Sequence, residues 1–150
     1  MGKILWQWHT YQQLSTDLLY AILRLRQEVF GVEQSCAYLD LDGRDQYSMH
    51  LTGHDADGEL VAYLRLVEPG KRFPEPSIGR VVTSLKVRRS GVGKVLMAEG
   101  VRKAAGMYPG QPNRISAQQY LERFYSSFGY VRAGEVYDED GIPHVEMVRL

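Results

Sequence analysis

Residues 78–105 read IGRVVTSLKVRRSGVGKVLMAEGVRKAA, and this stretch decides the expected fold. The β-branched run at 78–83 predicts a strand, a basic turn follows at 86–90, and Gly91 and Gly93 open a helical pattern. A glycine-rich turn between a strand and a helix presents backbone N–H groups at the positive end of the helix dipole. We therefore expect this turn to bind the pyrophosphate group of a ligand, the alternative being a plain glycine-rich turn before a surface helix.

Two common pyrophosphate-binding motifs do not fit the spacing. A dinucleotide-binding fingerprint needs a third glycine three residues after Gly93, where Leu96 stands. A Walker-type loop needs a glycine five residues before the Gly93-Lys94 pair and Ser or Thr after it, but Arg88 and Val95 occupy those positions. The turn therefore indicates a phosphorylated ligand of another class.

Composition limits the classes of protein and partner. The 150 residues are enough for one sizeable core, and we expect a single domain over 1–150. Acidic and basic residues balance at 18 each, so no overall charge favours nucleic acid or an anionic membrane. The one cysteine, Cys36, excludes an internal disulfide and a multi-cysteine zinc site, and we expect it to be a small buried filler. With no apolar run of membrane-spanning length and no secretory signal pattern at the start, we expect a cytoplasmic protein without a metal.

Hydrophobic periodicity predicts an α+β fold with a mixed, mostly antiparallel sheet. A helix capped by Ser15 is expected to run through Phe30 and to stop at Gly31. An Asp140-Gly141 pair marks the turn of a last hairpin. The expected order is strand 4–9, helix 16–30, strands 49–54 and 59–67, strand 78–83, helix 91–107, strand 114–117, helix 119–128, and strands 131–137 and 144–149.

Residues 32–47 show no clear period and carry several acidic and aromatic side chains. A calcium-binding EF-hand loop that began at Asp40 would need glycine at position 45, where Asp45 stands. We expect this segment to be a solvated connection between the first helix and the sheet.

Two motifs resemble those of a known enzyme superfamily. Residues 88–93, RRSGVG, fit the pattern Arg/Gln-x-x-Gly-x-Gly/Ala and resemble the acyl-CoA pyrophosphate loop of the GNAT N-acyltransferase superfamily. Residues 117–130, AQQYLERFYSSFGY, resemble the later GNAT motif, although many GNAT proteins carry Asn where Gln118 stands. Four further segments resemble the ElaA group of this superfamily: VFGVEQSCAY at 29–38, DGRD at 42–45, IGRV at 78–81 and DGIPH at 140–144.

The resemblance implies that acyl-CoA lies where the sheet splays between strands 78–83 and 114–117. Main-chain groups of the first strand are then expected to pair with the pantetheine amides as an added strand would. Glycines at 91 and 93 allow the phosphates to approach the backbone. The residues expected to bind the cofactor are Val81, Val82, Thr83, Arg88, Arg89, Ser90, Gly91, Val92, Gly93, Lys94 and Gln118.

The implied reaction is transfer of an acyl group, expected to be acetyl from acetyl-CoA, to a primary amine by direct attack in a ternary complex. Tyr125 is the candidate general acid, because a phenol stays protonated at neutral pH and is able to donate a proton to the CoA sulfur. Its alternative role is that of a core aromatic residue. Candidate bases are Glu33, Asp45, His50 and His144, and the first three are also candidates for contacting a cationic amine substrate.

Two other functions compete with this interpretation. Residues 26–30, RQEVF, followed by acidic residues, also resemble acyl-homoserine-lactone synthases, which share the architecture. A CoA-binding module without catalysis is the second alternative, and Tyr125 argues against it only weakly. The sequence leaves open the acyl acceptor, the acyl chain and self-association into a homodimer.

Overall fold

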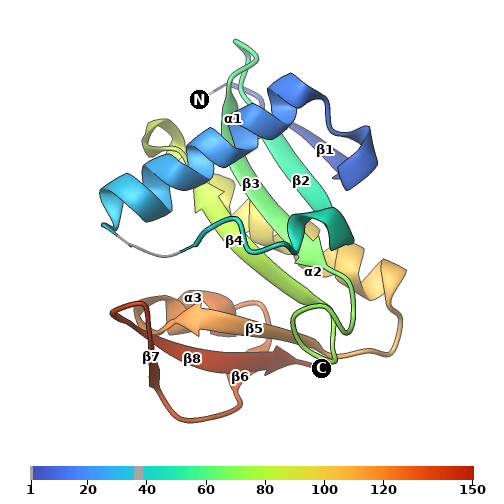
Figure 1. Cartoon of the computed structure of the whole chain (residues 1–150), viewed down its shortest axis with the longest axis vertical. Coiled ribbons are helices and arrows are strands. Elements are labelled where there is room, and N and C mark those ends of the chain that lie inside the picture. Colours follow the sequence, from blue (N-terminus) through green and yellow to red (C-terminus); the bar gives the residue numbers. More distant parts are fainter. Residues whose placement is uncertain (1, 36–38) are drawn as a thin grey trace.

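The computed structural model describes residues 2–35 and 39–150 (Figure 1). Cys36, with the prediction that it is a buried filler, lies outside the described residues. The α-helices and β-strands are β1 (Leu5–Thr10), α1 (Thr16–Arg26), β2 (Ser48–His54), β3 (Leu60–Val67), β4 (Ser77–Thr83), α2 (Val92–Met107), β5 (Asn113–Gln118), α3 (Glu122–Ser126), β6 (Tyr130–Arg132), β7 (Tyr137–Glu139) and β8 (Ile142–Arg149). No described helix is long and apolar enough to cross a membrane.

The first sheet is antiparallel, in the order β1-β2-β3-β4, and α1 and α2 cover its opposite faces (Figure 1). Side chains alternate along a strand, so neighbouring residues of β3 enter different cores. Leu64 lies in the cluster that includes Leu96 of α2, whereas Tyr63 lies in the cluster that includes Ile22 of α1. All four are at most 1% exposed, so β3 is buried on both faces and forms the centre of the molecule.

The second sheet has the order β5-β8-β6, and β7 also pairs with β8. Asp140 and Gly141, with φ angles of 54° and 83°, form the tight turn between β7 and β8 that the Asp-Gly pair predicts. Where the sequence predicted one strand over 131–137, residues 133–136 interrupt it, so that β6 and β7 are two short strands on the same partner.

The two sheets meet along β4 and β5, which run in the same direction and diverge toward their C-terminal ends (Figure 1). At the start of the pair, the backbone N–H of Arg114 donates to the carbonyl of Pro76 at 3.2 Å. The predicted fold class, an α+β fold whose sheet is splayed at a central parallel pair, is therefore confirmed.

A bulge in β4 contributes to the divergence. The register passes from the Tyr63–Val82 pair to the Arg65–Gly79 pair, so that two residues of β4, Arg80 and Val81, stand opposite one residue of β3. Such an extra residue bends a strand and increases its twist. Arg80 accordingly has a φ of 50°, in the left-handed region that non-glycine residues rarely adopt.

Two helices differ from the sequence prediction. α1 continues as a π-helical segment, Gln27–Glu33, which passes through Gly31 instead of ending there. Gly31 therefore does not terminate the helix, and the nearest atoms to a Cβ built there are those of the flexible, exposed Gln27 side chain. The helix predicted over 119–128 is a 3-10 turn followed by the short α3, and Gly129, with a φ of 93°, ends it.

Candidate active site

A cleft of about 380 Å³ lies in the splay between β4 and β5. Its walls come from both strands, from the π-helical extension of α1, from the loop between β3 and β4, from α3 and from the β7–β8 hairpin. The polar and charged residues of its lining include Glu33, Gln34, Arg65, Arg72, Arg80, Arg88, Gln118, Tyr125, Glu139 and His144. The fold therefore brings residues from both ends of the chain into one cavity.

The glycine-rich turn forms the N-terminus of α2, a short distance along the chain from the end of β4. Gly91 is the N-cap with a φ of 87°, and no side chain caps the first turn, which leaves its backbone N–H groups available to an anion. A Cβ at Gly93 would meet only the Cγ2 of Thr83, at an ordinary 3.9 Å. The packing of the described residues therefore does not require glycine at 93, whereas the close approach of a phosphate would.

The other residues predicted to bind the cofactor differ in exposure. Among those of the turn, the side chain of Val92 is buried in the core, so only its main chain is available to a ligand. Val82 is likewise buried against α1. The residues of the turn whose side chains or backbone are exposed are Arg89, Ser90, Gly91 and Lys94.

Arg88 and Glu33 form an ion pair at the rim of the cleft. The Nη1 of Arg88 lies 2.6 Å from the Oε2 of Glu33, and its Nη2 donates to the carbonyl of Thr83 at 3.0 Å. Glu33 is therefore held against the end of β4, beside the turn before α2. This contact ties the extension of α1 to the strand that borders the cleft.

Tyr125 lies on α3 and faces the same cleft. It is 8% exposed, and the rings of Phe124 and Tyr130 pack edge-on against it at centroid distances of 5.3 and 6.1 Å. Burial raises the pKa of the Tyr125 phenol, with a smaller contribution from Tyr120. No hydrogen bond engages its hydroxyl within residues 2–35 and 39–150, so Tyr125 offers a protonated donor with no competing partner.

Two amide side chains meet across the cleft. The Nε2 of Gln118 donates to the Oε1 of Gln34 at 3.1 Å, which joins the end of β5 to the segment after α1. The Oε1 of Gln118 is buried and has no hydrogen-bond partner within the described part of the chain. A buried acceptor without a donor is costly, so this atom is suited to a donor from a ligand.

His144 stands next to Gln118 in the ladder between β5 and β8 and is 7% exposed. Its Nδ1 lies 2.8 Å from the carbonyl oxygen of Ile142, and its Nε2 lies 3.2 Å from an oxygen of Glu139. Of the four candidate bases, His144 and Glu33 line the cleft.

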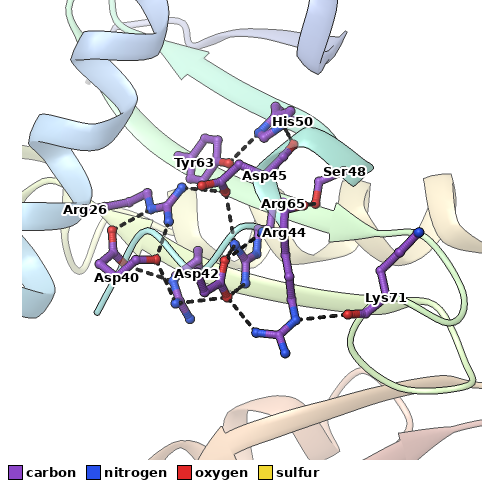
Figure 2. A network of polar contacts seen from close by, with 11 residues as sticks. Arg26, Asp40, Asp42, Arg44, Asp45, Ser48, His50, Tyr63, Arg65 and Lys71 are labelled. Carbon is purple, nitrogen blue, oxygen red and sulfur yellow. Dashed lines mark hydrogen bonds and ion pairs between the residues drawn. The ribbon is translucent and has the colours of Figure 1, made fainter. Parts of the chain in front are cut away.

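A buried network of arginine and aspartate side chains adjoins the cleft (Figure 2), and its Arg65 and Arg80 line the cleft wall. Arg26 pairs with Asp40 at 3.0 Å and with Asp45 at 2.8 Å. Arg65 pairs with Asp42 at 2.7 Å and with Asp45 at 3.0 Å. The prediction that this acidic segment is a solvated connection is therefore wrong, because its aspartates neutralise arginines that α1 and β3 bury.

The network controls the charge of its carboxylates. Burial alone would raise the pKa of Asp42, but the hydrogen bonds and charge of Arg65, together with the charge of Arg80, lower it far below its ordinary value. Burial is likewise outweighed at Asp45, whose pKa is lowered by Arg26 and Arg65. Arg80 extends the network to the bulge of β4, since its Nε lies 2.8 Å from Asp40.

Asp45 and His50, predicted to contact the substrate or act as bases, do not line the cleft. Asp45 is held by its two arginines. His50 is 1% exposed, and its ring nitrogens lie 2.9 Å from the carbonyl of Asp45 and 2.6 Å from the hydroxyl of Tyr63. Burial lowers the pKa of His50, which favours the neutral ring. The geometry gives these two residues a structural place in the network and does not support a substrate contact.

Comparisons with known proteins agree with this geometry. The sequence model of the acetyltransferase (GNAT) domain matches residues 11–150. The chain belongs to the GNAT acetyltransferase family. Protein ElaA of Escherichia coli is 42% identical over 146 residues, which are 96% of this chain and 95% of that protein. Its crystal structure superimposes with a TM-score of 0.92, covering 99% of this chain and all of that one.

Two further relatives in other bacteria are similar over nearly their whole length. A UPF0039 protein of Synechocystis is 45% identical over 97% of this chain and 95% of its own. The crystal structure of an acyl-CoA N-acyltransferase from Pseudomonas aeruginosa has a TM-score of 0.93 at 40% identity, covering 99% of this chain and 100% of that one. The resemblance to GNAT proteins and to their ElaA group is thus confirmed.

Glu139 is a cleft residue that the sequence interpretation missed. A two-residue Asp-Gly turn fixes the register of the hairpin and pairs Tyr137 with His144. Because residues two apart in a strand share a face, Glu139 lies on the same face as His144. The Asp140-Gly141 turn in the sequence was sufficient to place Glu139 beside His144, once the pairing of residues across the hairpin was derived from it.

Proposed function

We propose that this GNAT protein is an N-acetyltransferase that moves an acetyl group from acetyl-CoA to a primary amine by direct attack within a ternary complex. The observation that carries the proposal is Tyr125: a buried, protonated phenol, without a hydrogen-bond partner in the described chain, inside a cleft between two splayed parallel strands. A free donor in an enclosed site suits a leaving group that must gain a proton.

The residues at the end of β4 and at the start of α2 suit the cofactor. Val81 to Thr83 border the cleft at the edge of the first sheet, where β4 pairs with β3 on one side and with no other strand of that sheet. The uncapped first turn of α2 supplies N–H donors for a pyrophosphate, and the space beside Gly93 lets the phosphates approach. Arg88 and the exposed Lys94 add positive charge.

The reaction requires two proton transfers, one from the amine and one to the departing sulfur, and side chains of the cleft are able to take part in them. An alkylamine arrives as ammonium, with a reference pKa of about 10.4 for lysine, and must lose a proton before it attacks. Tyr125 donates its hydroxyl proton to the departing thiolate sulfur. A CoA-binding module without catalysis would have no use for this free hydroxyl, which supports the enzyme over the module.

The test measures release of free thiol from acetyl-CoA with a panel of small amines, polyamines and peptides. Tyr125→Phe should keep acetyl-CoA binding, because the ring and its packing remain, and should lose about 100-fold or more of turnover, the usual contribution of a general acid. Tyr20→Phe is the matched control, because it removes the same hydroxyl from a side chain that is 71% exposed on α1. Unchanged turnover in Tyr125→Phe would assign Tyr125 to the core alone.

A further inference from the structure

The β7–β8 hairpin contributes the side chains of Glu139 and His144 to the cleft. The Nδ1 of His144 lies 2.8 Å from the carbonyl oxygen of Ile142. A carbonyl only accepts, so Nδ1 carries the proton, and in the neutral ring the lone pair is on Nε2. Backbone therefore fixes the tautomer of His144, and its basic nitrogen is turned toward Glu139 and the cleft.

The Nε2 of His144 and a carboxylate oxygen of Glu139 face each other, and when the histidine ring is neutral both atoms are acceptors. The two atoms are 3.2 Å apart, so in that neutral state the pair lacks a proton donor. Two acceptors at this distance are satisfied by a cationic donor that bonds to both. A primary ammonium, with three N–H groups on one nitrogen, has the required number and charge.

In the structure, the guanidinium of Arg72 occupies the position of such a cation beside Glu139. The Nη2 of Arg72, from the loop between β3 and β4, lies 3.5 Å from the Oε1 of Glu139. Both side chains line the cleft and are about one-third exposed, at 30% and 36%. A long, exposed ion pair contributes little to stability, so an incoming ammonium is able to replace Arg72 at small cost.

We infer that Glu139 and His144 form the site for the acceptor amine, in which Glu139 binds the ammonium and the Nε2 of His144 takes its proton. The inference rests on the proposed acetyltransferase function and deepens it. It assigns the acceptor to the class of primary alkylammonium compounds and gives Glu139 a catalytic contact.

The proposed transfer conserves protons and electrons. One N–H bond of the ammonium breaks, its electron pair stays on nitrogen, and the proton passes to Nε2 of His144 and then to solvent. The nitrogen pair forms the new N–C bond while the C–S bond breaks and its electron pair leaves on sulfur. Sulfur takes the proton of Tyr125, and the second proton that nitrogen loses restores the Tyr125 phenol. One proton is released for each amide formed.

The decisive variant is His144→Asn. Its amide N–H is able to keep the hydrogen bond to the carbonyl of Ile142, while the basic Nε2 is lost. Turnover is measured by thiol release with two acceptors of similar size: an alkylamine that is protonated at neutral pH, and an arylamine that is already neutral there. A base is needed only for the first, so kcat should fall about 100-fold with the alkylamine and only a few-fold with the arylamine.

Glu139→Gln gives the second readout. It keeps the shape but removes the charge that attracts a cation, so KM for the alkylamine should rise about tenfold while KM for acetyl-CoA and for the arylamine stays unchanged. Asp138→Asn is the control, because it removes a neighbouring exposed carboxylate of the same hairpin that does not line the cleft.

The outcomes separate the two claims. If the wild type is active and His144→Asn loses the same factor with both amines, His144 is structural and this inference is overturned alone. If the KM for the alkylamine is the same in Glu139→Gln as in the wild type, Glu139 does not bind the ammonium, and this inference is again overturned alone. A wild type that releases no thiol with any amine would overturn the proposed function and this inference with it.

Discussion

Replacement of Asp45 by asparagine tests the energetic weight of the buried network. Asp45 pairs with Arg26 at 2.8 Å and with Arg65 at 3.0 Å, and these arginines are 0% and 2% exposed. The asparagine side chain would have nearly the same shape and one acceptor oxygen, but no charge. Two buried guanidinium groups would then share fewer counter-charges in a region that water does not reach.

The expected cost follows from this burial. Removing one partner of a buried ion pair costs about 3–5 kcal/mol, because the remaining charge is left uncompensated. A domain of this size has a free energy of unfolding of about 5–15 kcal/mol, and each 1 kcal/mol changes Tm by about 2–4 °C. We therefore expect Asp45→Asn to lower Tm by roughly 6–20 °C.

The assay is thermal and urea unfolding of the variant beside Glu28→Gln. Glu28 forms an exposed pair with Arg24, with side chains 57% and 73% accessible, and such pairs are worth about 0.3–0.5 kcal/mol. The control should therefore unfold within about 2 °C of the wild type. An equally small change in Asp45→Asn would refute the claim that the network holds this segment in place.

The stabilisation that Asp45 provides should decrease as the pH falls into the acid range. The pKa of Asp45 is lowered in the fold from an ordinary 3.8, so its contribution is complete above that value and is lost as pH falls through the lower folded pKa. The stability difference between wild type and Asp45→Asn should be constant from neutral pH to about 5 and should narrow below about 4. A difference that widened in acid would contradict the lowered pKa.

Two glycines of α2 should respond in opposite ways to the same substitution. Gly93→Ala should stabilise the unliganded protein by about 0.5 kcal/mol, because its Cβ meets only Thr83 at 3.9 Å, yet should weaken acetyl-CoA binding about tenfold by holding the phosphates away. Gly100→Ala should instead lower Tm, since its Cβ would lie 2.8 Å from a methyl of the fully buried Leu64 and overpacking costs about 1–3 kcal/mol, while acetyl-CoA binding stays unchanged. Calorimetric titration and thermal unfolding of the two variants measure both quantities, and parallel behaviour would contradict the assigned roles.

The helices, strands and turns around the cleft were predictable because each is specified by residues close together in the sequence. The β-branched run, the Gly91-x-Gly93 turn and the Asp140-Gly141 turn each specify a backbone shape within a few residues. The order of these elements predicted the α+β fold class, the resemblance of residues 88–93 and 117–130 to GNAT motifs predicted the family, and both are confirmed. Tyr125 was predicted as the general acid from a short motif in the same way; it lines the cleft, and its role stays a prediction.

The network was not predictable by the same reasoning. Arg26, Asp45 and Arg65 are far apart in the sequence and meet only because α1 crosses the face of the sheet beside β3. A segment rich in aspartate has the composition of a solvated loop unless its buried partners are known. Because these buried partners were unknown, Asp45 and His50 were predicted to contact the substrate. Glu139 was missed for another reason: finding it required the strand register of the β7–β8 hairpin.

The most direct test of the central claim is calorimetric titration of acetyl-CoA into the wild-type protein, with NAD and ATP as matched phosphorylated controls. We expect saturable binding of one acetyl-CoA per chain, competition by free CoA, and a corresponding rise in Tm that the two nucleotides do not produce. Absence of binding by acetyl-CoA and by every other acyl-CoA would contradict the assignment of the cleft between β4 and β5.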